Sequence, residues 1–102
     1  MIDVMSRLDE VKAKTADALR TAEADPGASV VLVAVVREFD KKADKSNANS
    51  GTEAAARDAV IELEQAGDSA KAAVEADLGA SEATRQAVQD AHLAICILKT
   101  EV

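Results

Sequence analysis

The stretch Glu23-Ala24-Asp25-Pro26-Gly27-Ala28-Ser29 combines residues that end one helix with residues that begin the next. With one exception, the same residues return fifty-two positions later as Glu75-Ala76-Asp77-Leu78-Gly79-Ala80-Ser81. In a chain rich in alanine and acidic residues, a match over seven positions is weak evidence on its own. Whether it marks a repeated structure depends on the segments that flank it.

Each copy of this heptapeptide is predicted to form a turn between two helices. Gly27 and Gly79 can adopt the left-handed backbone conformation that ends a helix. Ser29 and Ser81 can cap the helix that follows, because a serine hydroxyl accepts a hydrogen bond from a free backbone N–H group. These four residues are therefore the expected turn residues.

The segments on both sides of each turn carry apolar or small residues at helical spacing. Alternating steps of four and three residues keep one stripe of a helix facing a partner. The offset of fifty-two residues that relates the turns also relates the stripes. The stripes before the turns are Val4, Leu8, Val11, Thr15, Ala18 and Ala22, and Ala56, Val60, Leu63, Gly67, Ala70 and Val74; those after the turns are Leu32, Val36, Phe39 and Ala43, and Thr84, Val88, Ala91 and Ile95, continued by Leu98 and Val102.

Turns and stripes together predict an all-α protein, an antiparallel four-helix bundle made of two pseudo-repeated helical hairpins. The chain of 102 residues fits a single helical domain over 1–102. The first hairpin is expected over 1–45 and the second over 52–102. The polar segment 46–51 has no apolar periodicity and is predicted to be the linker between them.

The first helix is expected to run from Ile2 to Ala24 and the second to Lys45. The third begins after Ser50 or Thr52, either of which can act as its N-cap, and runs to Leu78. Gly67 lies within this helix.

The segment 66–69 could instead end one helix and begin another. A continuous helix is favoured, because the stripe keeps its phase through Gly67 and an interior glycine costs only about 1 kcal/mol relative to alanine.

The segment 29–36 reads Ser-Val-Val-Leu-Val-Ala-Val-Val, which on residue propensity alone is typical of a buried β-strand. The residues that follow it, 37–42, continue the helical stripe and contain no turn residue. A lone strand would also have no clear pairing partner. We therefore predict that this segment is helical.

Composition excludes several classes of partner. A net charge of −7 argues against nucleic-acid binding, which depends on Lys and Arg, and disfavours membrane surfaces. The longest apolar runs, 30–36 and 93–98, are shorter than the ~20 residues that span a bilayer. The N-terminus has no export signal and the single cysteine excludes an internal disulfide, so we expect a cytoplasmic protein.

The sequence contains no pattern typical of an enzyme. It has no Gly-rich phosphate loop, no nucleophile elbow, and no His, Cys and acid set that the chain order places together. The acidic residues mostly alternate with Lys and Arg at helical spacing, as on a solvent-exposed face. We therefore expect a non-enzymatic protein and assign no catalytic, cofactor-binding or metal-binding residue.

The second and fourth helices are apolar beyond their stripes. A helix that is apolar on all sides is normally buried on all sides, whereas a four-helix bundle leaves one side of each helix in water. Either irregular packing hides the extra residues or they form an association surface, most simply with another copy in a homodimer, or with a different protein partner. The expected interface residues are Val30, Val31, Ala34, Leu93, Cys96 and Ile97.

His92 and Cys96 are the only residues of their types and lie one helical turn apart, so both could reach one metal ion. A structural metal site needs about four ligands, and only carboxylates, Met5 or a second copy could supply the others. The simpler interpretation is a histidine at the edge of the bundle and a cysteine that packs as a small apolar residue.

Two helical families offer comparisons for His92. Histidine-phosphotransfer domains are bundles of similar size with one exposed reactive histidine, but theirs is followed by a basic residue and small residues, whereas His92 is followed by Leu93-Ala94-Ile95-Cys96. The pair Met5 and His92 is similar to the axial ligands of b-type haem bundles, yet the chain has few aromatic residues to surround a porphyrin. A phosphorelay or ligand-binding bundle using His92, and a structural or designed helical protein without a partner, are the alternatives to self-association.

Overall fold

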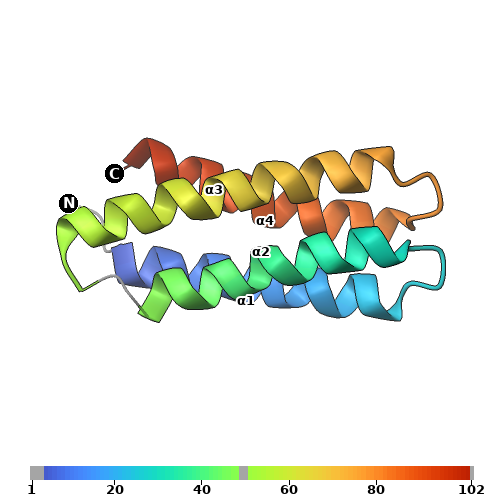
Figure 1. Ribbon diagram of the computed structural model, residues 1–102, viewed down its shortest axis with the longest axis horizontal. Coiled ribbons are helices and arrows are strands. Elements are labelled where there is room, and N and C mark those ends of the chain that lie inside the picture. Colours follow the sequence, from blue (N-terminus) through green and yellow to red (C-terminus); the bar gives the residue numbers. More distant parts are fainter. Residues whose placement is uncertain (1–3, 49–50, 102) are drawn as a thin grey trace.

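The structure, a computed structural model, describes residues 4–48 and 51–101, with the backbone alone for Val4 and Met5. Over these residues it contains four helices: α1 (Val4–Ala24), α2 (Val30–Ala48), α3 (Glu53–Ala76) and α4 (Glu82–Glu101). Helices α1 and α3 each contact both α2 and α4, and successive helices run in opposite directions (Figure 1). The predicted all-α four-helix bundle is therefore confirmed.

The apolar segment that resembled a strand forms the start of α2. Ser29 caps this helix as expected: its Oγ accepts a hydrogen bond from the Leu32 backbone N–H at 3.1 Å, and its carbonyl oxygen accepts one from Val33 N at 3.1 Å. Leu32 and Val36 are buried in the bundle. Burial of one face against neighbouring helices thus outweighs the strand propensity of the valines.

Helix α2 ends three residues later than Lys45, at Ala48, so the predicted linker boundary at residue 46 is wrong. The reason is Ser46, which follows Ala43 on the buried stripe. Its side chain is buried, and its Oγ donates a hydrogen bond to the carbonyl oxygen of Ala59 in α3 at 3.3 Å. This contact holds the last turn of α2 against α3.

Helix α3 begins and ends close to the predicted residues. Thr52 is its N-cap, with the hydroxyl accepting a hydrogen bond from Ala55 N at 3.1 Å. Ser50, the alternative cap, lies outside the described residues. The helix ends at Ala76, two residues before Leu78, because Asp77 takes an extended conformation with φ −89° and ψ 97°.

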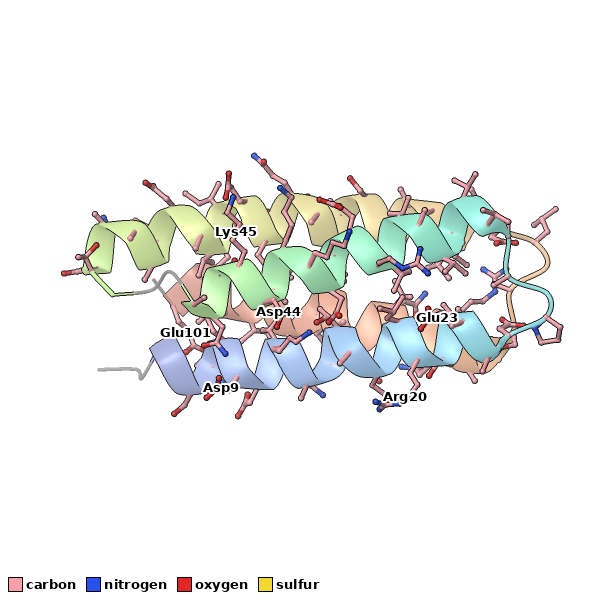
Figure 2. All side chains as sticks on the ribbon, turned by 60° about the horizontal axis from the view of Figure 1, so that its bottom comes forward. Asp9, Arg20, Glu23, Asp44, Lys45 and Glu101 are labelled. Atoms are coloured by element: carbon pink, nitrogen blue, oxygen red, sulfur yellow. The ribbon has the colours of Figure 1, made fainter. Side chains whose placement is uncertain are left out.

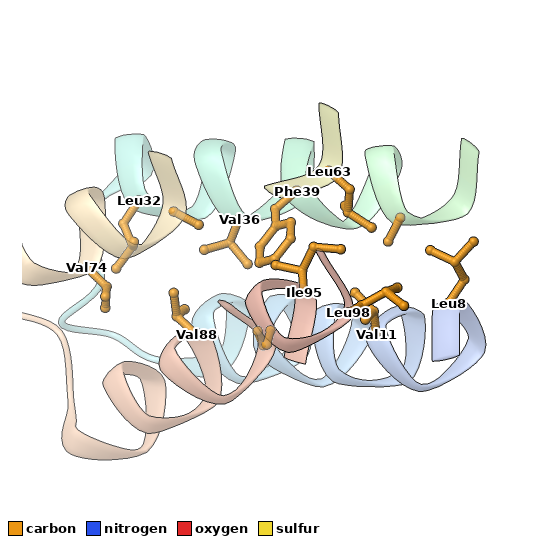
Figure 3. Packing of buried hydrophobic residues seen from close by; sticks show 14 of the residues in the cluster. Leu8, Val11, Leu32, Val36, Phe39, Leu63, Val74, Val88, Ile95 and Leu98 are labelled. Carbon is orange, nitrogen blue, oxygen red and sulfur yellow. The ribbon is translucent and has the colours of Figure 1, made fainter. Parts of the chain in front are cut away.

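The predicted stripes form the core of the bundle (Figure 3). The large apolar side chains in it come from all four helices, and Phe39 is the only aromatic one. Every stripe residue whose side chain is described is buried; Val4 and Val102 lie outside that set. The buried stripe residues are Leu8, Val11, Thr15, Ala18, Ala22, Leu32, Val36, Phe39, Ala43, Ala56, Val60, Leu63, Gly67, Ala70, Val74, Thr84, Val88, Ala91, Ile95 and Leu98.

Two buried stripe residues are threonines, and both hydroxyls bond to carboxylates. Thr15 Oγ1 lies 2.8 Å from Asp40 Oδ1, and the same oxygen forms an ion pair with Lys12 Nζ at 2.7 Å. Thr84 Oγ1 donates to Asp25 Oδ2 at 2.7 Å. Because a buried hydroxyl without a partner is destabilising, these carboxylates allow polar residues to occupy stripe positions.

Helix α3 is continuous through Gly67, and packing explains why glycine occupies this position. A methyl group there would lie 3.1 Å from Phe39 Cζ, 3.2 Å from Ile95 Cγ2 and 3.3 Å from His92 Cδ2. These separations are shorter than ordinary van der Waals contact. Gly67 therefore provides the space that the single phenylalanine occupies.

We predict that Gly67→Ala destabilises the protein by up to about 2 kcal/mol, measured by urea unfolding. Helix propensity alone would favour alanine by about 1 kcal/mol. Overpacking of a filled core costs about 1–3 kcal/mol, and Phe39 and Ile95 are fully buried, so neither can move into solvent. In a Phe39→Leu background, where the ring is absent, the same change should destabilise the protein less, because only the contacts with Ile95 and His92 remain. A stabilised Gly67→Ala single variant would show that the core relaxes freely around this position.

The turns of the two hairpins lie side by side at one end of the bundle (Figure 1). Asp25, in the turn between α1 and α2, bonds to the start of α4. Its Oδ2 accepts hydrogen bonds from Ser81 N at 2.8 Å and from the Thr84 hydroxyl, while its Oδ1 accepts one from Gly27 N at 2.9 Å. One carboxylate thus shapes its own turn and caps a helix of the other hairpin.

Asp77, in the turn between α3 and α4, makes the reciprocal contact. Its Oδ2 accepts a hydrogen bond from Ser29 N at 2.8 Å, before the start of α2, and its Oδ1 accepts one from Gly79 N at 3.0 Å. Arg85 of α4 donates to the carbonyl oxygens of Val74 and Asp77 and closes the turn. We call the reciprocal contacts of Asp25, Asp77 and the two turn glycines the turn clasp.

The glycines of the turn clasp do not take the predicted left-handed conformation, because no described residue has a positive φ. They are required for a different reason. A Cβ atom on Gly27 would overlap the carbonyl oxygen of Gly79, and one on Gly79 would overlap the carbonyl oxygen of Gly27. Glycine is therefore needed because two backbones meet here.

The hydrogen bonds of the turn clasp favour charged carboxylates. The Ser81 backbone N–H, then the Thr84 hydroxyl and the Gly27 N–H, lower the pKa of Asp25 to about 2. The Ser29 N–H likewise lowers the pKa of Asp77. Because both folded-state pKa values are depressed, this stabilisation is present above the unfolded-state pKa of about 4 and is lost as the pH falls towards the folded-state value.

We predict that Gly27→Ala and Gly79→Ala each destabilise the bundle by about 1–3 kcal/mol in urea unfolding, because the clashing atom is a backbone carbonyl that cannot move without shifting a turn. Gly51 provides the matched control, since a Cβ there would meet nothing within 4 Å. Gly51→Ala should be neutral or stabilising by up to about 1 kcal/mol. Equal effects of all three changes would contradict the turn clasp.

Candidate functional site

His92 of α4 lies against α3, where its imidazole meets a carboxylate. His92 Nε2 is 2.7 Å from Asp68 Oδ1. The His92 side chain is only 16% exposed, whereas that of Asp68 is 59% exposed. The ring therefore packs between the helices while the carboxylate remains open to solvent.

Cys96 follows His92 by one turn of α4 and faces the same side. Its Sγ lies 3.4 Å from His92 Nε2 and 3.8 Å from His92 Nδ1. One donor atom from each of Asp68, His92 and Cys96 can be chosen so that all three lie within 4.8 Å of one another. In the described part of the chain, this is the group of His, Cys and acidic residues with the geometry to hold a metal ion.

Glu64 precedes Asp68 by one turn of α3 and extends this group. Its Oε1 forms an ion pair with Lys99 Nζ at 2.6 Å, and its side chain is 13% exposed. Its other oxygen, Oε2, is buried and has no hydrogen-bond partner. We call Glu64, Asp68, His92, Cys96 and Lys99 the α3–α4 polar cluster.

Charges within the α3–α4 polar cluster influence one another. The hydrogen bond from His92 is the main cause that lowers the pKa of Asp68, because it favours the charged carboxylate. The hydrogen bond to Glu64 raises the pKa of Lys99. Burial, followed by the nearby charges of Glu64 and Asp68, raises the pKa of the Cys96 thiol, so it is protonated at neutral pH and is not an activated nucleophile.

The other two roles considered for His92 gain no geometric support. A phosphotransfer histidine must be open to a partner protein, whereas the His92 ring is mostly buried and its Nε2 bonds to Asp68. A haem would need a second axial ligand, and the side chain of Met5 lies outside the described set. Metal coordination is the chemistry that the donor atoms themselves allow.

The six predicted interface residues separate into two groups. Val30 is 86% exposed, Val31 70%, Leu93 58% and Ile97 44%, and Ala34 is also exposed. The alternative that the fold hides these five residues is therefore wrong. Cys96, by contrast, is half-buried in the α3–α4 polar cluster.

Four of these residues line two separate grooves, because α2 and α4 occupy opposite corners of the bundle: Val31 and Ala34 in one, Leu93 and Ile97 in the other. We call the first the α2–α3 groove, which has a volume of about 530 Å³. We call the second the α1–α4 groove, with about 270 Å³. Residues that line the α2–α3 groove include Val31, Ala34, Glu38, Lys42 and Glu62, and residues that line the α1–α4 groove include Lys14, Asp90, Leu93 and Ile97.

Several residues of these sites were not identified from the sequence. In the sequence Glu64 is one of the acids that alternate with Lys and Arg, and Asp68 belongs to the segment 66–69 that could end a helix, although the predicted hairpin places both opposite the His92 and Cys96 turn of α4. Leu78, 93% exposed, and Ile61, 41% exposed, add to the apolar surface. Leu78 was placed at the end of a helix, and Ile61 lies beside a stripe, so neither position indicated exposure.

Comparisons of the chain with protein-family models, with curated proteins and with solved structures give no match. Among the described residues, no helix is long and apolar enough to span a bilayer.

Proposed function

We propose that this chain is a small, acidic, non-enzymatic helical module that self-associates, most simply as a homodimer, through apolar residues of α2 and α4. The observation that carries the proposal is the exposure of large apolar side chains at both grooves, above all Val31 at 70%. Isolated exposed apolar residues are normal on any protein. Here they line concave surfaces between helices, which favours occupation by another helix.

The rim of the α2–α3 groove supports a second copy of this chain as the occupant. Glu38, Lys42 and Glu62 place both charge signs beside Val31. In a two-fold dimer the same patch meets itself in opposite orientation, so Lys42 of one copy can approach an acid of the other. The α1–α4 groove has the same mixture, with Lys14 and Asp90 beside Leu93.

Hydrophobic burial and charge repulsion oppose each other in such a dimer. Full burial of one Val, Leu or Ile side chain contributes roughly 1.5–3 kcal/mol. In the dimer each of these side chains would contribute the fraction of this free energy that corresponds to its exposed surface. Against this, each chain carries a net charge of −7, and charged side chains project from the helices (Figure 2). Because salt screens repulsion between surface charges, association should strengthen as ionic strength rises.

We predict that the parent is dimeric by light scattering at high micromolar concentration and physiological salt. Val31→Lys should abolish association through the α2–α3 groove, and Leu93→Lys with Ile97→Glu should abolish it through the α1–α4 groove. At least one variant should be monomeric with unchanged helicity by circular dichroism, because all three residues are exposed. Ala72→Lys is the control, since Ala72 is exposed on α3 and lines neither groove.

A monomeric parent under these conditions would overturn the proposal and would favour the competing one, a structural or designed helical protein without a partner. Equal dissociation by Ala72→Lys would mean that added charge, and not loss of an apolar contact, separates the copies. A complex that both groove variants leave intact would place the interface elsewhere.

We also infer that the two hairpins are pseudo-repeats of one unit. The common offset of fifty-two residues in turns and stripes supports this. The equivalent hydrogen bonds of Asp25 with Ser81 and of Asp77 with Ser29 support it further, because equivalent residues make equivalent contacts in the two turns.

A further inference from the structure

The α3–α4 polar cluster contains a set of donor atoms that suits a divalent transition metal. Zn²⁺ binds cysteine sulfur, histidine nitrogen and carboxylate oxygen, and its structural sites have four ligands. Glu64 and Asp68 are separated by one turn of α3, and His92 and Cys96 by one turn of α4, so each pair projects from one face of its helix. Asp68 meets His92 and Cys96 across the interface between these helices.

The distances between three of the donor atoms can be compared with those of a tetrahedral site. Zn–N and Zn–O bonds of about 2.0–2.2 Å and a Zn–S bond of about 2.3 Å place ligand atoms roughly 3.2–3.7 Å from one another. His92 Nε2 lies 3.4 Å from Cys96 Sγ and 2.7 Å from Asp68 Oδ1. An ion between them would replace the His92–Asp68 hydrogen bond, and these two atoms would move apart from 2.7 Å to make room for it.

Glu64 lies one turn before Asp68 on α3 and is the carboxylate that we add to this group as its fourth member. Its Oε2 is buried without a hydrogen-bond partner, which is costly for a carboxylate oxygen. Lys99 is the cation nearest to this carboxylate, and it reaches only Oε1. Because the Lys99 side chain is 48% exposed, it can move into solvent and leave Glu64 free to bind a cation.

We propose that Glu64, Asp68, His92 and Cys96 form a binding site for a borderline-soft divalent cation such as Zn²⁺. The ion binds between α3 and α4, within one chain. Three ligands would be anionic, since Cys96 loses its proton on coordination, and the ion would neutralise most of their charge. In the metal-free protein Lys99 is the cation that pairs with Glu64. It therefore competes with the metal ion for this carboxylate.

The test is a calorimetric titration of the folded, reduced and chelator-treated protein with ZnCl₂, followed by Co²⁺ absorption spectroscopy. We expect one Zn²⁺ per chain and a melting temperature that rises with added zinc. Co²⁺ should show the visible bands of tetrahedral coordination together with thiolate-to-metal charge transfer. The charge-transfer band identifies Cys96 as a ligand, since the chain has no other cysteine.

Four variants make the assignment specific. Because even residues behind metal ligands change affinity by about 10–100-fold, Cys96→Ser and His92→Gln should each weaken zinc binding by about 100-fold or more. Lys99→Met should tighten binding several-fold, since it removes the competing charge. Asp44→Asn is the control: it removes a carboxylate that pairs with Lys12 at 3.2 Å on another face, and zinc affinity should not change.

Three results would overturn this site. The first is equal zinc affinity in the parent and in Cys96→Ser. The second is one zinc per two chains, which would mean that two copies supply the ligands. The third is weaker zinc binding by Lys99→Met than by the parent. Each variant is first checked by circular dichroism. Failure of self-association would leave these measurements unaffected, because all four ligands belong to one chain.

Discussion

The turn clasp is the constraint on which the arrangement of the bundle depends. Four stripes of mostly small residues bury apolar surface, but such surfaces fit together in more than one register. Asp25 and Asp77 select one, because each caps the second helix of the other hairpin through a backbone N–H at 2.8 Å. The contact between Gly27 and Gly79 brings the turns close enough for both bonds to form.

Contacts at the turn between α3 and α4 and in the middle of the bundle fix how these two helices face each other. Asp77 and Arg85 close the turn between these helices, and Ile95 of α4 packs beside Gly67 of α3 in the middle of the bundle. With the register set at both points, Asp68 lies opposite His92. The α3–α4 polar cluster therefore follows from contacts that involve none of its own charged groups.

Helical periodicity predicted the fold and the described core residues, because spacing alone decides which side of a helix is buried. It did not predict the role of Gly27, which depends on a backbone fifty-two residues away. It placed the end of α2 at Lys45 because Ser46 looked like a linker residue, and only the contact with Ala59 shows otherwise. Asp68 was not predicted as a site residue, because the sequence shows it only as part of a possible helix end, and its position opposite His92 depends on the hairpin register.

The turn clasp can be tested most directly by a carbon-detected NMR titration of the Asp25 carboxyl group. The hydrogen bonds from Ser81, Thr84 and Gly27 predict a pKa of about 2. An Asp25 that titrates like an unperturbed aspartate, with a pKa near 3.8, would contradict the clasp and the arrangement of hairpins that depends on it.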